Sequence, residues 1–207
     1  MSQNRYAEFC EIIAAPGRGK TTLLIDALKQ KLKSGDRVLV VLPDQSEPAW
    51  FPWYKNGVIE AEDLEQKFNP DFKGICLIEY EAKITFPFLL KLFKSGKLKN
   101  LNLVLDDPQY MNSRPEPEII RILSRKRQYC IDVWSNAHSY DQVPQQFFQY
   151  ITIYGLGFTE AEIILRKEQL GKTHEVIKRR VDTTANVPRG HKNYYYFEFF
   201  KKDGTKI

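Results

Sequence analysis

The residues Ala-Ala-Pro-Gly-Arg-Gly-Lys-Thr occupy positions 14–21 and join two segments of different character. An apolar run over 9–14 comes directly before the glycines, and residues 21–33 follow with apolar side chains at helical spacing. Gly17 and Gly19 permit a tight backbone turn between the two segments. The stretch therefore predicts a strand, a glycine-rich loop and a helix in succession.

The same eight residues have the spacing of a phosphate-binding loop, with Ala14 in place of the first glycine. Backbone N–H groups of such a loop surround phosphate oxygens, and the dipole of the following helix favours the anion. We expect Lys20 to neutralise the β- and γ-phosphates, Thr21 to hold Mg²⁺, and Thr22 to contact the α-phosphate side. The residues predicted to bind ATP are Ala15, Pro16, Gly17, Arg18, Gly19, Lys20, Thr21 and Thr22.

Apolar runs and amphipathic segments alternate along the rest of the chain. This alternation favours a mostly parallel sheet, because parallel strands need crossover helices. Residues 43–73, which contain several prolines and aromatic residues, are expected to be irregular. Strands are predicted at 37–42, 74–78, 101–105 and 129–134, helices at 82–94, 115–127 and 159–170, and a terminal hairpin at 194–204. The predicted fold is the α/β fold of P-loop NTPases, with a mostly parallel central sheet flanked by helices and a C-terminal β-hairpin.

Length and composition fit a single P-loop ATPase domain over 1–207, with a core at about 6–155 and a basic, aromatic extension at about 156–207. Residues 1–165 hold 20 Lys and Arg against 21 Asp and Glu, whereas residues 166–207 hold 11 against 5. This excess fits an anionic partner or a solvated basic face equally well. The three cysteines are expected to be buried free thiols, and we expect no direct membrane span.

Two carboxylates end the apolar run Leu101–Leu105. In a parallel sheet the carboxyl end of this strand lies at the same edge as the glycine-rich loop. We expect Asp106 to reach the Mg²⁺ shell and Asp107 to polarise the attacking water. The predicted metal ligands are thus Thr21 and Asp106.

Asn136 follows the next predicted strand, and its amide is suited to sensing the γ-phosphate. We expect a structural or DNA-facing role for His138, since no Cys/His spacing accompanies it. Arg125 and Arg127 are candidates for completing the site of a neighbouring subunit. The residues predicted to act in catalysis are Lys20, Asp106, Asp107, Asn136, Arg125 and Arg127.

These segments occur in an order that resembles the FtsK–HerA ATPases, and within them the genome-packaging ATPases of membrane-containing icosahedral viruses. The resemblance spans about residues 9–150. It is carried by 14–21, 101–107, Ser124-Arg125-Lys126-Arg127, and Ser135-Asn136 followed by Asp141 and Val143-Pro144. Asp107 stands where Glu is usual in the family, and Asn136 stands where Gln is common.

The resemblance implies an ATPase that uses ATP and Mg²⁺ to move double-stranded DNA into a preformed capsid. It also implies a homo-oligomeric ring, often a hexamer, with the arginine supplied in trans and with viral capsid or portal vertex proteins as partners. We expect such a protein in the host cytoplasm or on the virion at the packaging vertex. The alternatives are a phage-assembly or secretion ATPase resembling the zonula occludens toxin family, and a nucleotide-binding adaptor without motor activity.

Overall fold

The computed structural model describes residues 7–43, 48–56, 58–59, 63–67, 72–111, 115–159 and 194–207, together with five single positions between 160 and 193. Its strands are β1 (Phe9–Ile13), β2 (Arg37–Leu42), β3 (Val58–Ile59), β4 (Gly74–Glu79), β5 (Leu101–Leu105), β6 (Ile131–Ala137), β7 (Ile153–Leu156) and β8 (Glu198–Lys201). Within these residues the strands form one sheet in the order β3-β4-β2-β5-β6-β1-β7-β8. All neighbouring pairs are parallel except β7 and β8. The mostly parallel sheet expected from the sequence is therefore confirmed.

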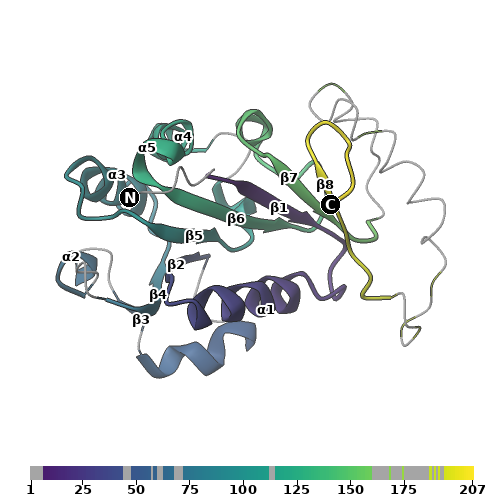
Figure 1. Cartoon of the computed structure of the whole chain (residues 1–207), viewed down its shortest axis with the longest axis horizontal. Coiled ribbons are helices and arrows are strands. Elements are labelled where there is room, and N and C mark those ends of the chain that lie inside the picture. Colours follow the sequence, from purple (N-terminus) through teal and green to yellow (C-terminus); the bar gives the residue numbers. More distant parts are fainter. Residues whose placement is uncertain are drawn as a thin grey trace.

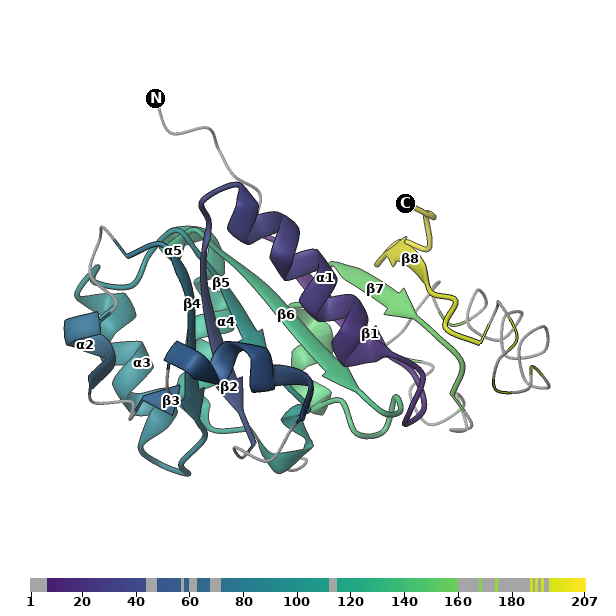
Figure 2. The ribbon, with the colours of Figure 1, turned by 90° about the horizontal axis from the view of Figure 1, so that it is seen from below.

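Helices cover both faces of this sheet (Figure 1). They are α1 (Lys20–Lys33), α2 (Leu64–Lys67), α3 (Thr85–Lys94), α4 (Pro117–Ser124) and α5 (Lys126–Tyr129), with 3₁₀ segments η1 (Pro48–Asn56), η3 (Pro108–Met111) and η4 (Gln145–Gln149). Helix α1 lies across β1 and β6 on one face, as Figure 2 shows from below. Helices α3, α4 and α5 lie on the other face. The loop between β1 and α1 is consequently held at the carboxyl edge of the parallel strands.

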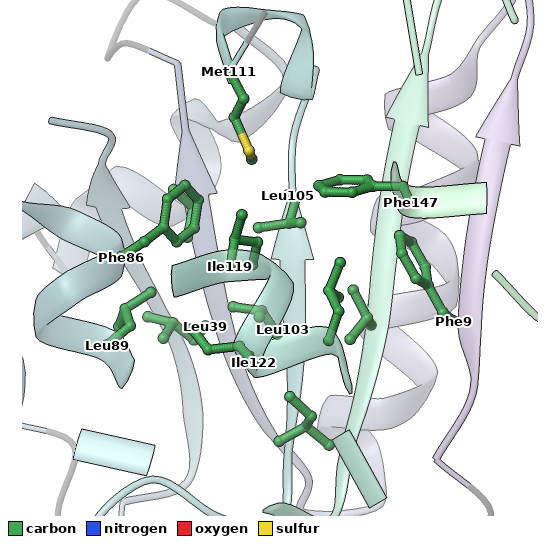
Figure 3. Packing of buried hydrophobic residues seen from close by; sticks show 14 of the residues in the cluster. Phe9, Leu39, Phe86, Leu89, Leu103, Leu105, Met111, Ile119, Ile122 and Phe147 are labelled. Carbon is green, nitrogen blue, oxygen red and sulfur yellow. The ribbon is translucent and has the colours of Figure 1, made fainter. Parts of the chain in front are cut away.

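Two apolar clusters separate the helices from the sheet. The larger one joins α3, α4 and η4 to the sheet through side chains such as Phe86, Ile119 and Phe147 (Figure 3). The smaller one joins α1 and η1 to the opposite face through Leu24 and Trp50. Strand residues alternate between the clusters, as the two-residue period of a strand requires. Because both faces are covered, the strands read as continuous apolar runs in the sequence.

The C-terminal hairpin is present, and β8 also adds to the edge of the main sheet. Residue Phe200 pairs with Lys206 across the turn that contains Gly204, whose φ is 87°. Strand β8 pairs antiparallel with β7, so that Glu198 lies opposite Leu156. In the sheet, only β7 lies between β8 and β1.

Several predicted boundaries differ from the structure. Strand β6 extends to Ala137, three residues beyond the expected end, because residues 135–137 continue the ladder with β1. The helix expected at 115–127 is divided at Arg125, whose φ of −111° and ψ of 14° are not helical. Residues 48–56, expected to be irregular, form a 3₁₀ helix. The helix expected at 159–170 lies outside the described residues, apart from positions 159 and 168.

The three cysteines form no disulfide: Cys10 and Cys76 are buried, and Cys130 is half-buried. Burial raises the pKa of the Cys10 thiol, with additional effects from nearby Glu11 and Glu8, so this thiol is held in its neutral form. In the part of the chain that the structure describes, the helices are too short or too polar to span a bilayer.

Candidate nucleotide-binding site

The glycine-rich loop has the backbone conformation that its sequence requires. Gly17 and Gly19 have φ angles of 72° and 81°, in the left-handed region that residues with a Cβ rarely adopt. The next residue, Lys20, begins the 14-residue helix α1. The loop is tied to the edge of the sheet because the Ala15 N–H donates to the Phe158 carbonyl at 2.6 Å. Backbone amides and a helix N-terminus therefore converge at one place, as an anion site needs.

Lys20 is buried, and its ammonium group is held inside the site. Its Nζ donates to the Ala15 carbonyl at 3.3 Å and lies 2.7 Å from His138 Nδ1. An ammonium group only donates, so His138 Nδ1 must accept. The imidazole proton then lies on Nε2, which is 3.4 Å from Asp107 Oδ2. His138 thus connects the lysine of the loop to the second carboxylate.

The Asn136 amide joins the loop to the first carboxylate. Its Nδ2 donates to Asp106 Oδ1 at 2.7 Å and to Thr21 Oγ1 at 3.4 Å. Asp106 directly follows β5, and Asn136 lies on the neighbouring parallel strand β6. Both face α1, because Val104 and Trp134, two residues before them, belong to the apolar cluster on the α1 side of the sheet. The other oxygen of Asp106 accepts from Trp50 Nε1 at 2.7 Å. Two distant segments of chain therefore meet around Asn136.

Asp107 is held by its backbone and by one side-chain oxygen. It has a φ of 47°, which is uncommon for a residue with a side chain. Its N–H donates to Asn136 Oδ1 at 2.6 Å, and its Oδ2 accepts from Gln109 Nε2 at 2.7 Å. Its Oδ1 is buried without a hydrogen-bond partner among the described residues. The described residues thus leave the hydrogen-bonding capacity of that oxygen unused.

Thr21 and Asp106 supply oxygen ligands of the type that Mg²⁺ prefers. The Asn136 amide reaches both oxygens, so one small group already bridges them. Among the described residues, no group of three or more His, Cys, Asp or Glu is arranged to hold a metal ion by itself. A magnesium ion held here would therefore take its remaining ligands from phosphate and water, which is its usual mode of binding in phosphate sites.

Glu11 is a carboxyl group inside the sheet, next to this site. It is fully buried on β1 and lies opposite Ser135 of β6. Burial raises its pKa to about 8; the Ser135 hydroxyl lowers the pKa, and the charge of Asp107 raises it. Glu11 is consequently protonated in the folded protein near neutral pH, whereas it is ionised in the unfolded chain.

Exchanging Glu11 for glutamine should therefore change how stability depends on pH. In the wild type, the folded state binds a proton that the unfolded state releases above its pKa of 4.5, so stability falls as pH rises towards 8. Between about pH 5 and about pH 8, Glu11 should lower the free energy of unfolding of the wild type by roughly 3 kcal/mol, and Glu11→Gln should not show this decrease. Urea unfolding followed by circular dichroism measures the difference. Glu81→Gln, at an exposed carboxylate, is the control; equal pH slopes for wild type and Glu11→Gln would contradict the expectation.

The remaining predicted residues lie elsewhere. The Arg18 side chain is buried between the rings of Phe158 and Tyr194, at 4.4 and 3.7 Å from their centroids. Arg125 and Arg127 are exposed and precede β6, so they lie at the opposite edge of the sheet from Asp106. Any part that these two arginines take in hydrolysis would have to be in the site of another subunit.

Three further residues of the site were not expected from the sequence. His138 lies two residues beyond Asn136, and this spacing alone could have placed it on the same side of the strand. Glu11 is a charged residue within an otherwise apolar run, which is also a readable signal. Trp50 comes from a proline-rich segment that carries no such pattern, and its contact with Asp106 depends on tertiary structure.

Comparisons with known proteins give matches among solved structures. No family model matches the sequence, and no curated protein matches it. The genome-packaging NTPase B204 from Sulfolobus turreted icosahedral virus 2, in complex with AMP, is 12% identical and superposes with a TM-score of 0.71, covering 100% of this chain and 98% of that chain. B204 from Sulfolobus turreted icosahedral virus, described as a DNA-packaging ATPase, is 15% identical, with a TM-score of 0.67 and coverage of 100% and 97%.

A third similar structure is VirB4 of Thermoanaerobacter pseudethanolicus, at 11% identity and a TM-score of 0.59, covering 100% of this chain and 90% of that chain. At these identities the similarity concerns the fold. The resemblance to genome-packaging NTPases that the sequence motifs indicate is confirmed at that level. The chain therefore has a P-loop NTPase fold, shared over its whole length with genome-packaging NTPases of turreted icosahedral viruses.

Proposed function

We propose that this protein binds ATP with Mg²⁺ and hydrolyses it to drive the packaging of double-stranded viral DNA into a preformed capsid. The observation that carries the proposal is the Asn136 amide, which contacts Thr21 beside the glycine-rich loop and Asp106 at the end of β5. A loop that binds phosphate needs only its own backbone. Hydrolysis also needs a carboxylate at the metal and a second one at the water, and this edge of the sheet holds both.

The triphosphate would lie against the N-terminus of α1, where Gly17 and Gly19 direct backbone amides inwards. Lys20 would leave the Ala15 carbonyl and His138 to donate to the phosphate oxygens. The bound ion, held by Thr21 and Asp106, would neutralise charge on the β- and γ-phosphates. Lys20 and the ion would thus act on the same charged end of the substrate.

In the hydrolysis step, a water oxygen forms a bond to the γ-phosphorus while the bond between that phosphorus and the ADP oxygen breaks. The Asp107 side chain is partly exposed at this edge of the sheet, so its carboxylate is the acceptor that we assign to the attacking water. His138 Nε2 and Gln109 Nε2 both lie at Asp107 Oδ2, which fixes the carboxylate plane. Asn136 would report the presence of the γ-phosphate through its contacts with Asp106 and with the Asp107 N–H.

Coupling to DNA is supported by the fold and by charge. The fold is shared with B204, described as a genome-packaging NTPase, over nearly the full length of both chains. The last 42 residues hold 11 Lys and Arg against 5 Asp and Glu, which suits an anionic partner. Lys201 and Lys202 are both exposed, but the Lys202 ammonium group donates to the Phe148 carbonyl at 2.6 Å. Lys201 is thus the better candidate for contact with phosphate.

A ring of identical subunits completes the proposal. Arg125 and Arg127 lie at the edge of the sheet opposite their own site, and both are exposed. In a ring, most simply a hexamer, one of them would enter the neighbouring site and stabilise charge on the γ-phosphate. We place this single ATPase domain, with Mg-ATP, in the host cytoplasm or at the packaging vertex of the virion, where capsid or portal proteins would hold it.

The rate of ATP hydrolysis by the purified full chain tests the proposal. We expect magnesium-dependent release of phosphate that rises when duplex DNA is added, and a rise that weakens as salt increases. Absence of ATP binding would refute the nucleotide site. Binding without hydrolysis, even with DNA, would favour the nucleotide-binding adaptor instead, and hydrolysis indifferent to DNA would remove the motor from the proposal.

A further inference from the structure

The C-terminal segment 194–197 packs directly against the glycine-rich loop, although more than 170 residues separate them in the sequence. The Tyr194 ring stacks on the Arg18 guanidinium, and Arg18 Nη1 donates to the Tyr194 carbonyl at 3.4 Å. The Tyr195 ring approaches Gly19 so closely that a Cβ on this glycine would lie 3.1 Å from it. Figure 1 shows this part of the chain beside the loop between β1 and α1.

Phe197 is held near the loop by its contact with Gly157, which directly follows β7. A Cβ at Gly157 would lie 2.8 Å from the Phe197 ring and 2.6 Å from Ala14, so only glycine allows this close approach. Phe197 also packs against the apolar cluster under α1. The segment is therefore fixed against the loop at two points, through Arg18 and through Gly157.

A cavity of about 380 Å³ opens between this segment and the first turns of α1. Its volume falls within the range of roughly 300–1,000 Å³ that is typical of small-molecule sites. Tyr195 is 54% exposed, so a large face of its ring is free of protein contact. The residues that line the cavity are Gly19, Thr22, Leu23, Asp26, Tyr195 and Phe197.

The position of the cavity relative to the loop indicates which end of a bound nucleotide it would receive. Thr21 faces Asn136 and the acidic edge, where the γ-phosphate would lie, whereas the next residue, Thr22, lines the cavity. Thr22 is the residue that we expect on the α-phosphate side, and the base and sugar follow the α-phosphate. The uncharged end of the nucleotide suits this cavity.

We propose that this cavity receives the nucleobase of the bound nucleotide, with Tyr195 stacking on the base. Phe197 and Leu23 would complete its apolar wall. This inference rests on the proposed function and deepens it, since it assigns base recognition to the C-terminal segment. The phosphates are bound by the N-terminal loop, so one nucleotide would bridge both ends of the chain.

Comparing ATP with inorganic tripolyphosphate tests the assignment, because tripolyphosphate carries the same charged end without a base. Binding of each to the full chain is measured with Mg²⁺ by isothermal titration calorimetry. For Tyr195→Ala we expect ATP affinity to fall roughly 5- to 100-fold, the range for loss of one stacked base, and tripolyphosphate affinity to stay within about twofold. The control is Tyr196→Ala, an adjacent tyrosine that is 48% exposed and does not line the cavity; it should change neither affinity.

Two results would overturn the assignment. One is a Tyr195→Ala variant that binds ATP as tightly as the wild type. The other is an equal loss for ATP and tripolyphosphate, which would make Tyr195 a support of the loop. Failure of the wild type to bind either compound would instead refute the proposed function, and this inference with it, so the two failures are distinguishable.

Discussion

Replacing Lys20 with methionine should abolish ATP hydrolysis and weaken ATP binding by roughly 100- to 10,000-fold. The estimate follows from losing two charge-assisted hydrogen bonds, each contributing about 1.5–3 kcal/mol, to a buried triphosphate. Lys20 is buried at the N-terminus of α1, so water does not replace its ammonium group efficiently. Phosphate release and competition with a fluorescent ATP analogue measure the two effects.

The matched control for this change is Lys33→Met on the same helix. Lys33 is exposed in the last turn of α1, at the opposite end of the helix from the loop. Changes of exposed side chains away from a site have small effects, so the variant should bind and hydrolyse ATP as the wild type does. Circular dichroism of Lys20→Met checks that the fold survives, since His138 Nδ1 and the Ala15 carbonyl lose a donor. A correctly folded variant with wild-type turnover would exclude Lys20 from the mechanism.

The parallel sheet was predictable because its strands are buried on both faces. Strand β2 shows this best: residues 38–42 are all buried, so they had to be a continuous apolar run in the sequence. The loop was predictable for a similar reason, since Gly17 and Gly19 occupy positions where positive φ leaves few other choices. Local chemistry determines both features, and a single sequence displays local chemistry.

The interior of the site was less predictable, because its contacts join segments that are far apart. Asn136 was identified as a strand-end amide, but its bridge between Thr21 and Asp106 depends on the packing of α1 against two strands. The indole of Trp50 reaches Asp106 from a segment whose prolines indicated only irregular structure. His138 was assigned a structural or DNA-facing role, and its position between Lys20 and Asp107 appears only in three dimensions.

The two carboxyl groups beside the site show why residue type alone does not assign a role. Asp107 and Glu11 are close enough for the charge of Asp107 to raise the pKa of Glu11. Glu11 is enclosed by the sheet and keeps its proton to about pH 8, so it is a poor acceptor near neutral pH. Asp107 is partly exposed at the carboxyl edge of the sheet, where a ligand can reach it. Position in the fold therefore favours Asp107 as the acceptor.

Exchanging Asp107 for asparagine should consequently lower the rate of ATP hydrolysis by about 100- to 10,000-fold, the usual contribution of a general base, while leaving ATP affinity nearly unchanged. Asparagine keeps the size of the side chain, so the contacts of its backbone N–H with Asn136 should survive. Single-turnover hydrolysis separates this chemical step from binding and product release. The control is Asp141→Asn, an exposed carboxylate that hydrogen-bonds to Ser139 outside the site.

His138 provides a second measurement of the same step. If His138 acts by holding the Asp107 carboxylate through Oδ2, His138→Ala should slow hydrolysis in the wild type but have little further effect in Asp107→Asn. Equal losses in both backgrounds would show that His138 acts independently, through its contact with Lys20. If Asp107→Asn hydrolysed ATP at the wild-type rate, Asp107 would be excluded, and Glu11 would become the candidate acceptor for the proton of the attacking water. In that case the rate should rise as pH approaches 8, because only the ionised form of Glu11 accepts a proton.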